Sequence, residues 1–206
     1  MASSPRSSAL PDLNHIFHTR PVVLVITVGV LFAFLSWVVA VGPGLRLRTE
    51  TLATAAAMSP VDDAVQRGKA VYLAEGCGYC HSQFVRATFV DAPYGRAHTA
   101  SDYARQNPPV PGTQRTGPDL SNVGVRQPSW MWNFMHLYNP RSMVPESIMP
   151  SFPWMFDVMT AEEAAGHEFA LYTAAFPAAF LDDGLVAVPR QEAVDLVAYL
   201  RTLKQE

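Results

Sequence analysis

The sequence predicts an all-α protein, in which one membrane-spanning helix precedes a helical domain with long loops. Three observations support this fold class: residues 21–45 carry no charge, apolar residues recur at helical spacing at both ends of the remaining chain, and no alternating strand pattern of useful length occurs. The 206 residues are 49% apolar and carry a net charge of −3. This composition excludes a disordered chain and a basic nucleic-acid-binding domain, so we expect no nucleic-acid partner.

Residues 21–45 are predicted to anchor the chain in a membrane as a single helix. A helix over residues 22–41 would be about 30 Å long, which is the thickness of a bilayer's hydrocarbon core. A cleaved signal peptide is the alternative, but its apolar region is usually only ~7–15 residues long. Residues 42–44, Gly-Pro-Gly, are predicted to end the helix. Arginines lie on both sides of the uncharged run, so the positive-inside rule leaves the orientation open.

The anchor separates segments of different character. The residues that follow it, RLRTETLATAAAMSP, are small and polar, as is typical of a linker. We therefore expect an N-terminal segment at 1–20, the anchor at 21–45, a linker at 46–60 and one folded domain at 61–206.

Four helices are predicted in the domain. Proline and aspartates at 59–63 precede apolar residues at helical spacing, which predicts that a helix starts there. A clear amphipathic pattern covers 192–203, and weaker patterns predict helices over 129–138 and 161–175. Residues 82–128 show little periodicity and are predicted to be mostly loop. A loop of that length inside a compact domain needs something to hold it.

Charge is distributed unevenly along the domain. Residues 86–141 carry six Arg against three Asp, whereas ten acidic side chains face three basic ones from Glu146 onward. A basic stretch in an acidic domain favours docking of a partner or neutralisation of a bound anion. A solvated surface of mixed charge is the simpler alternative.

The two cysteines, Cys77 and Cys80, are directly followed by His81. Cys-x-x-Cys-His is the attachment signature of a c-type haem, because thiols at this spacing reach both vinyl groups of one porphyrin and the His can lie under the iron. A thioredoxin-like redox pair would need a βαβ context, and a structural zinc site normally needs four Cys or His ligands. The motif therefore predicts one covalently bound haem c.

A second axial ligand would decide whether such a haem carries electrons or reacts with small molecules. The six methionines after the motif are Met131, Met135, Met143, Met149, Met155 and Met159. Met149 lies in a loop stiffened by three prolines, which suits a weak ligand, although a core Met is an equally simple explanation. Met131 and Met135 have the spacing of a packing stripe. His136 is the main rival ligand, but a lone His beside aromatic residues is more often structural.

Other groups are candidates for contacts around the haem. The turn at 115–120 offers the Pro118 carbonyl as an acceptor for the second ring nitrogen of His81, unless it is an ordinary turn. Arg115 or Arg141 is predicted to pair with the haem propionates, because a buried carboxylate needs a charged partner; a surface Arg is the alternative. Aromatic residues are predicted to be divided between the core and a docking surface: Trp130, Trp132, Phe134, Tyr138, Trp154 and Phe156.

Further motifs accompany the haem signature. They are Gly68-x-x-x-Tyr72, a Gly-Pro-x-Leu turn, a later Met-Pro and a last helix at 196–203, and together they resemble a class I cytochrome c. More narrowly, residues 75–86, 115–120 and 136–154 resemble subunit II of the cbb(3)-type cytochrome c oxidases, the FixO/CcoO family of membrane-anchored mono-haem cytochromes. The chain departs from the family pattern at 93–95 and 109–111, and 160–190 carry no motif of the family.

The resemblance implies a set of ligands and a function. Cys77 and Cys80 would bind the haem covalently, and His81 and Met149 would be its axial ligands. The Pro118 carbonyl would orient His81. The chain would pass electrons in aerobic respiration to a separate multi-span haem-copper catalytic subunit, with a di-haem cytochrome c subunit as the donor. Its single anchor could not house a haem-copper centre, so it would not reduce oxygen alone.

The resemblance also implies a location. Haem is attached to c-type cytochromes outside the cytoplasm, so residues 46–206 would face the periplasm of a bacterial inner membrane and residues 1–20 the cytoplasm. Two other functions stay open: the cytochrome c subunit of a related nitric oxide reductase, and a haem enzyme or sensor with an open iron.

Overall fold

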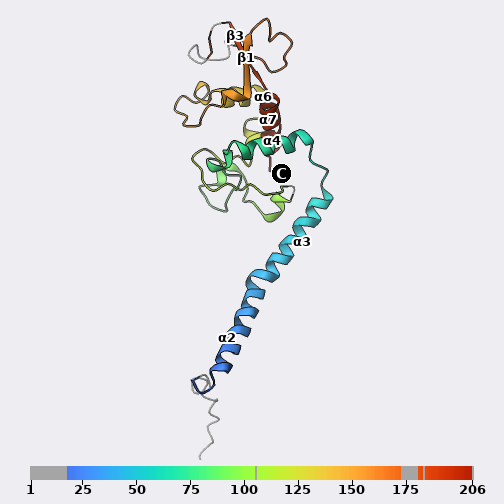
Figure 1. Cartoon of the computed structure of the whole chain (residues 1–206), viewed down its shortest axis with the longest axis vertical. Helices are drawn as coiled ribbons and strands as arrows, with labels where there is room; N and C mark the ends of the chain where they lie inside the picture. Colours follow the sequence, from blue (N-terminus) through green and yellow to red (C-terminus); the bar gives the residue numbers. More distant parts are fainter. Residues whose placement is uncertain (1–17, 105, 173–180, 183, 206) are drawn as a thin grey trace, which may run out of the picture. The chain divides into compact units, whose positions relative to one another are not determined.

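The computed structural model of the chain contains two compact units, one ending at Thr54 and the other beginning at Ala55 (Figure 1). The structure describes residues 18–104, 106–172, 181–182 and 184–205. Most of the predicted N-terminal segment, 1–20, therefore lies outside the described residues.

A helix from Pro21 to Ala57, most of which belongs to the first unit, is long and apolar enough to cross a membrane. Its parts are α2 (Pro21–Ser36), a π-helical turn (Trp37–Val41) and α3 (Gly42–Ala57). The prediction that Gly42, Pro43 and Gly44 end the helix is wrong, and most of the expected linker at 46–60 is helical. The backbone N–H of Gly42 donates to the Trp37 carbonyl, five residues back. This wider turn directly precedes Pro43 and makes room for its ring, which would otherwise clash with the preceding helical turn.

The second unit is organised around the crossing of α4 (Asp63–Ala74) and α7 (Gln191–Thr202), and both helices confirm predictions (Figure 1). Gly68 allows the close approach, since a Cβ there would lie 1.9 Å from the Asp195 carbonyl oxygen. Beside this contact, the Arg67 guanidinium donates to both carboxylate oxygens of Asp195 at 2.6 and 3.0 Å. The first and last helices of the domain are thus locked together at one point.

The remaining helices are short. The prediction of a helix over 129–138 is confirmed by α6 (Trp130–Tyr138), whose N-terminus is capped by the Ser129 side chain. As expected, residues 82–128 are mostly loop. They contain α5 (Val123–Arg126) and two 3₁₀ turns, η3 (Ala92–Tyr94) and η4 (Ala100–Tyr103). The other 3₁₀ turns are η2 (Cys77–Tyr79), η5 (Pro140–Ser142) and η6 (Pro153–Met155).

The domain also contains a three-stranded antiparallel sheet, so the predicted all-α fold is confirmed only in part: the chain is mostly helical but includes strands. Its strands are β1 (Phe156–Thr160), β2 (Leu171–Tyr172) and β3 (Leu185–Pro189), in the order β1-β3-β2. The predicted helix at 161–175 is also wrong over its described part, which consists of turns and β2; residues 173–175 lie outside the described residues.

The burial of the central strand β3 on both faces explains why the sequence pattern does not reveal the sheet. Ala187 faces the main core, whereas Val186 and Val188 face a second apolar cluster with Ala164 and Ala170. Because both faces of β3 are covered, its apolar residues do not alternate with polar ones.

The aromatic residues expected either in the core or on a docking surface are mainly core. Phe134 and Phe156 are buried, and Tyr138 is 9% exposed. Trp130 and Trp132 are half-buried. Trp154 is the exception, at 53% exposure.

Substituting Gly68 by Ala tests the helix crossing. We expect Gly68→Ala to lower the free energy of unfolding by about 3 kcal/mol, because the new Cβ would overlap the backbone of α7. Urea unfolding of the detergent-solubilised chain, followed by tryptophan fluorescence, measures the change. Gly44→Ala is the matched control, since a Cβ there meets nothing within 4 Å. Equal stability of the two variants would contradict this account of the crossing.

Candidate haem site

The Cys-x-x-Cys-His motif directly follows the C-terminal end of helix α4. The helix ends at Ala74 with Glu75 as its C-cap, and Gly76 follows with a φ of +70°, a left-handed conformation that suits glycine. The turn η2 then separates Cys77, which is half-buried, from Cys80, which is exposed. The His81 N–H donates to the Cys77 carbonyl at 2.9 Å and closes the turn. The two thiols therefore lie at the ends of a single tight turn with the imidazole directly after it.

The ring of His81 is oriented by the turn at 115–120. Its Nδ1 lies 2.8 Å from the Pro118 carbonyl oxygen, so Nδ1–H donates and Nε2 is left with its lone pair. Gly117 lies directly against the ring, because a Cβ there would be 2.3 Å from His81 Cε1. The Gly117 N–H also donates to the Cys80 carbonyl at 2.9 Å. Burial lowers the pKa of His81 and favours the neutral form that binds metals.

A buried ionic network holds this turn in place. The Arg115 guanidinium pairs with Asp91 and Asp119, whose side chains are both 0% exposed. Its Nε donates to Ser82 Oγ at 2.6 Å, and that hydroxyl donates to Asp119 Oδ2 at 2.6 Å. Ser82 follows His81, and Asp119 follows Pro118. The network therefore joins the two residues adjacent to the His81–Pro118 contact.

Hydrogen bonds within this network lower the pKa values of its two carboxylates. Hydrogen bonds from Arg115, and then from Arg86, hold the pKa of Asp91 far below its usual range. Burial alone would raise the pKa of Asp119, but hydrogen bonds from Ser121, Ser82 and the Phe84 N–H lower it. Both carboxylates are therefore ionised at neutral pH.

Sequence analysis missed the roles of Asp91, Asp119 and Ser82. The three Asp within the basic stretch 86–141 were a usable signal, because each of them pairs with an Arg of that stretch. The pairing of Arg115 or Arg141 with a haem propionate stays a prediction. Both side chains, however, already have protein partners.

The Met149 loop is attached to the end of α6. Met149 is half-buried and packs against the same core cluster as Cys77. Its carbonyl accepts from Arg141 Nη1 at 3.1 Å, and the Phe152 N–H donates to the Leu137 carbonyl at 2.9 Å. A methionine between two such attachments has the limited freedom that a weak axial ligand requires.

His136, the rival ligand, stacks on Trp132 with ring centroids 4.6 Å apart. Its Nδ1 is buried without a hydrogen-bond partner among the described residues. Burial, and then the charge of His81, lower the pKa of His136 to about 4. The imidazole is therefore neutral and lies within electrostatic reach of His81.

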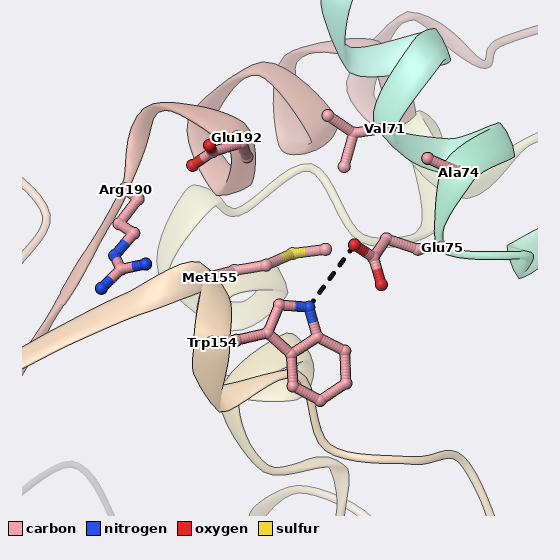
Figure 2. A pocket seen from close by; sticks show the side chains of 7 residues that line it. All are labelled: Val71, Ala74, Glu75, Trp154, Met155, Arg190 and Glu192. Atoms are coloured by element: carbon pink, nitrogen blue, oxygen red, sulfur yellow. Dashed lines mark hydrogen bonds between the residues drawn. The ribbon is translucent and has the colours of Figure 1, made fainter.

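A pocket of about 370 Å³ adjoins the motif (Figure 2). It is lined by residues at the end of α4, in η6 and around the start of α7: Val71, Ala74, Glu75, Trp154, Met155, Arg190 and Glu192. Figure 2 shows the Trp154 indole nitrogen directed at the Glu75 carboxylate, 3.4 Å away. This bond connects the segment after Met149 to the helix end before Cys77.

A comparison with known protein families identifies the family of the chain. The family model described as "Cytochrome C oxidase, mono-heme subunit/FixO" matches residues 14–176. The chain belongs to the FixO family. This confirms the resemblance of the motifs at 75–86, 115–120 and 136–154. None of the curated proteins matches the chain. FixO proteins are mono-haem cytochrome c subunits of the cbb(3) oxidase, so the family implies a haem, electron transport and a catalytic subunit as partner.

The side chains present fit a haem better than the alternatives considered for the two cysteines. A thiol pair, an imidazole with Nε2 free and a thioether on an attached loop form a suitable donor set. Among the described residues, no three or more His, Cys, Asp and Glu side chains are grouped so that they could hold a metal ion, as a zinc site would need. The described strands form an antiparallel sheet, unlike the βαβ context of a thioredoxin-like pair.

Substituting Asp91 by Asn tests the ionic network. We expect Asp91→Asn to cost about 3 kcal/mol of unfolding free energy, because it leaves the Arg115 charge with the more distant Asp119. Asp102→Asn is the matched control. Its pair with Arg96 is more exposed and is expected to contribute about 1 kcal/mol or less.

The network also predicts a pH dependence. The pKa of Asp91 is depressed in the folded chain, so its stabilisation is complete above the ordinary Asp value of about 3.9 and is lost as the pH falls toward the folded value. Urea unfolding between pH 3 and pH 7 should therefore show a smaller acid loss for Asp91→Asn than for the unmodified chain. Parallel pH profiles would show that Asp91 is not the group responsible.

Proposed function

We propose that this chain is the electron-transfer subunit of a haem-copper terminal oxidase of the cbb(3) type. Cys77 and Cys80 attach one haem c covalently, and His81 and Met149 are its axial ligands. The observation that carries the proposal is the contact of His81 Nδ1 with the Pro118 carbonyl, directly after two cysteines at haem-attachment spacing. It leaves Nε2 of a half-buried, neutral imidazole available for iron.

Several residues of the chain have distinct roles around the haem. When bound, the haem supplies a one-electron couple. The Pro118 carbonyl and Gly117 keep the His81 ring in one orientation. A thioether ligand raises the reduction potential and closes the iron to small molecules, and Arg141 restrains the Met149 loop. This arrangement suits an electron carrier with little reorganisation around the iron.

The proposed function requires a partner subunit that holds the haem-copper centre. The described residues of this chain include one helix that could span a membrane. A single span cannot enclose a haem-copper centre, so oxygen is reduced in the multi-span catalytic subunit and this chain is not catalytic alone. A di-haem cytochrome c subunit is the upstream donor. The family match favours this oxidase over a nitric oxide reductase.

The proposed location follows from haem attachment. C-type haem is attached outside the cytoplasm, which places residues 46–206 in the periplasm and 1–20 in the cytoplasm. The helix from Pro21 to Ala57 supports a single-pass anchor in the bacterial inner membrane. Within the second unit, the class I cytochrome c arrangement is supported by the α4–α7 crossing at Gly68.

Substitution of Met149 tests the proposed ligand set. The unmodified subunit, purified in detergent after c-type haem maturation, should have one covalent haem, and its reduced form should not bind carbon monoxide. Met149→Leu should open the iron to carbon monoxide, and Met149→His should lower the potential sharply while keeping the iron closed. Absorption spectra and redox titration measure these changes.

Met131→Leu is the matched control, because Met131 is a partly exposed residue of α6. It should leave the potential and the carbon monoxide response unchanged. Rapid carbon monoxide binding by the unmodified, folded subunit would overturn the proposal in favour of an enzyme or sensor with an open iron.

A further inference from the structure

Four buried side-chain atoms make no hydrogen bond to the described residues: Tyr72 Oη, Gln83 Nε2, Ser121 Oγ and His136 Nδ1. The first three have polar neighbours within the core. The Tyr72 hydroxyl lies near the Gln83 amide, and the Ser121 hydroxyl lies near the Asp119 carboxylate. His136 differs, because the groups that affect its ring are the indole of Trp132 and the charge of His81.

A buried ring nitrogen without a partner is costly, by about 1–3 kcal/mol. His136 is nevertheless held firmly in that position. It stacks on Trp132 at an interplanar angle of 12°, and the next residue of α6, Leu137, is bonded through its carbonyl to Phe152 of the Met149 segment. A ring that is fixed in place but lacks a partner indicates that a bound group supplies the acceptor.

The haem offers one strong acceptor for such a nitrogen. Its two propionates are carboxylates, and a carboxylate in a protein pocket needs a donor. The arginines that the sequence suggested for this purpose have other partners. Arg115 is surrounded by Asp91, Asp119 and Ser82, and Arg141 donates to the Met149 carbonyl. His136 has a buried ring nitrogen that makes no hydrogen bond to a described residue, and it lies within electrostatic reach of His81.

We propose that His136, through Nδ1–H, donates a hydrogen bond to a propionate of the bound haem. This inference rests on the proposed function, since it requires a haem at His81. His136 is then a haem-contacting residue and not an axial ligand. Its bond draws negative charge away from the iron, which favours the reduced state, and stacking on Trp132 keeps the donor in place.

The test uses the haem-loaded, full-length subunit in detergent. His136→Phe keeps an aromatic ring for Trp132 but removes the donor, whereas His136→Gln keeps a donor. We expect His136→Phe to shift the reduction equilibrium about tenfold toward the oxidised state, or ~59 mV for one electron, with much of the shift restored in His136→Gln. The propionate bending vibration in resonance Raman spectra should change in His136→Phe.

His167→Phe is the control for loss of an imidazole, because His167 is exposed on the turn before β2. An unchanged potential and propionate vibration in His136→Phe would overturn the inference while leaving the proposed function intact. Gain of carbon monoxide binding in His136→Phe would also overturn it, because this result would mean that His136 binds the iron and not a propionate. If the unmodified chain carries no haem, it is the proposed function that fails.

A measurement on the unmodified protein covers the case in which His136→Phe does not take up haem. Nitrogen-15 NMR of the reduced, diamagnetic subunit should find His136 with a hydrogen-bonded proton on Nδ1. An Nδ1 without a proton would overturn the inference.

Discussion

The contact between His81 and the Pro118 carbonyl is the interaction on which the site depends, and it is made by two loop residues. Neither helix nor sheet holds Pro118 in place. The buried pairs of Arg115 with Asp91 and Asp119 do so, through residues adjacent in sequence to both partners. Removing charges from water is expensive, so such a network is stable only when every charge has partners. Here each carboxylate receives several hydrogen bonds.

The same network explains how a long irregular segment stays in a compact domain. Residues 82–128 contain little regular backbone pairing, so their order comes from side chains. The Tyr103 hydroxyl donates to the Gln83 carbonyl, and Arg96 pairs with Asp102 in the same segment. The basic character of this stretch, which suggested a docking surface, is therefore largely internal. Among its described arginines, Arg86, Arg96 and Arg115 pair with its own aspartates.

The part of the site formed by α6 and the Met149 loop is built differently. There, α6 provides the Trp132–His136 stack, and the end of the helix holds the Met149 loop through backbone carbonyls. The family match shows a mono-haem cytochrome subunit, and the two thiols, the His81 imidazole and the attached Met149 loop are side chains that could hold such a haem. The exposed Trp154 and the pocket beside Glu75 lie next to the haem motif.

The sequence by itself determined the helices with strong periodicity, the apolar run long enough to span a membrane, the haem motif and the family, because each is encoded by residues close together in the chain. The tertiary structure alone decided the sheet, the continuation of the helix through Pro43 and the buried partners of Arg115. Strand β3 is covered on both faces, so its residues lack the alternation that marks a strand. Asp91 and Arg115 are 24 positions apart, and only folding brings them together in a place from which water is excluded.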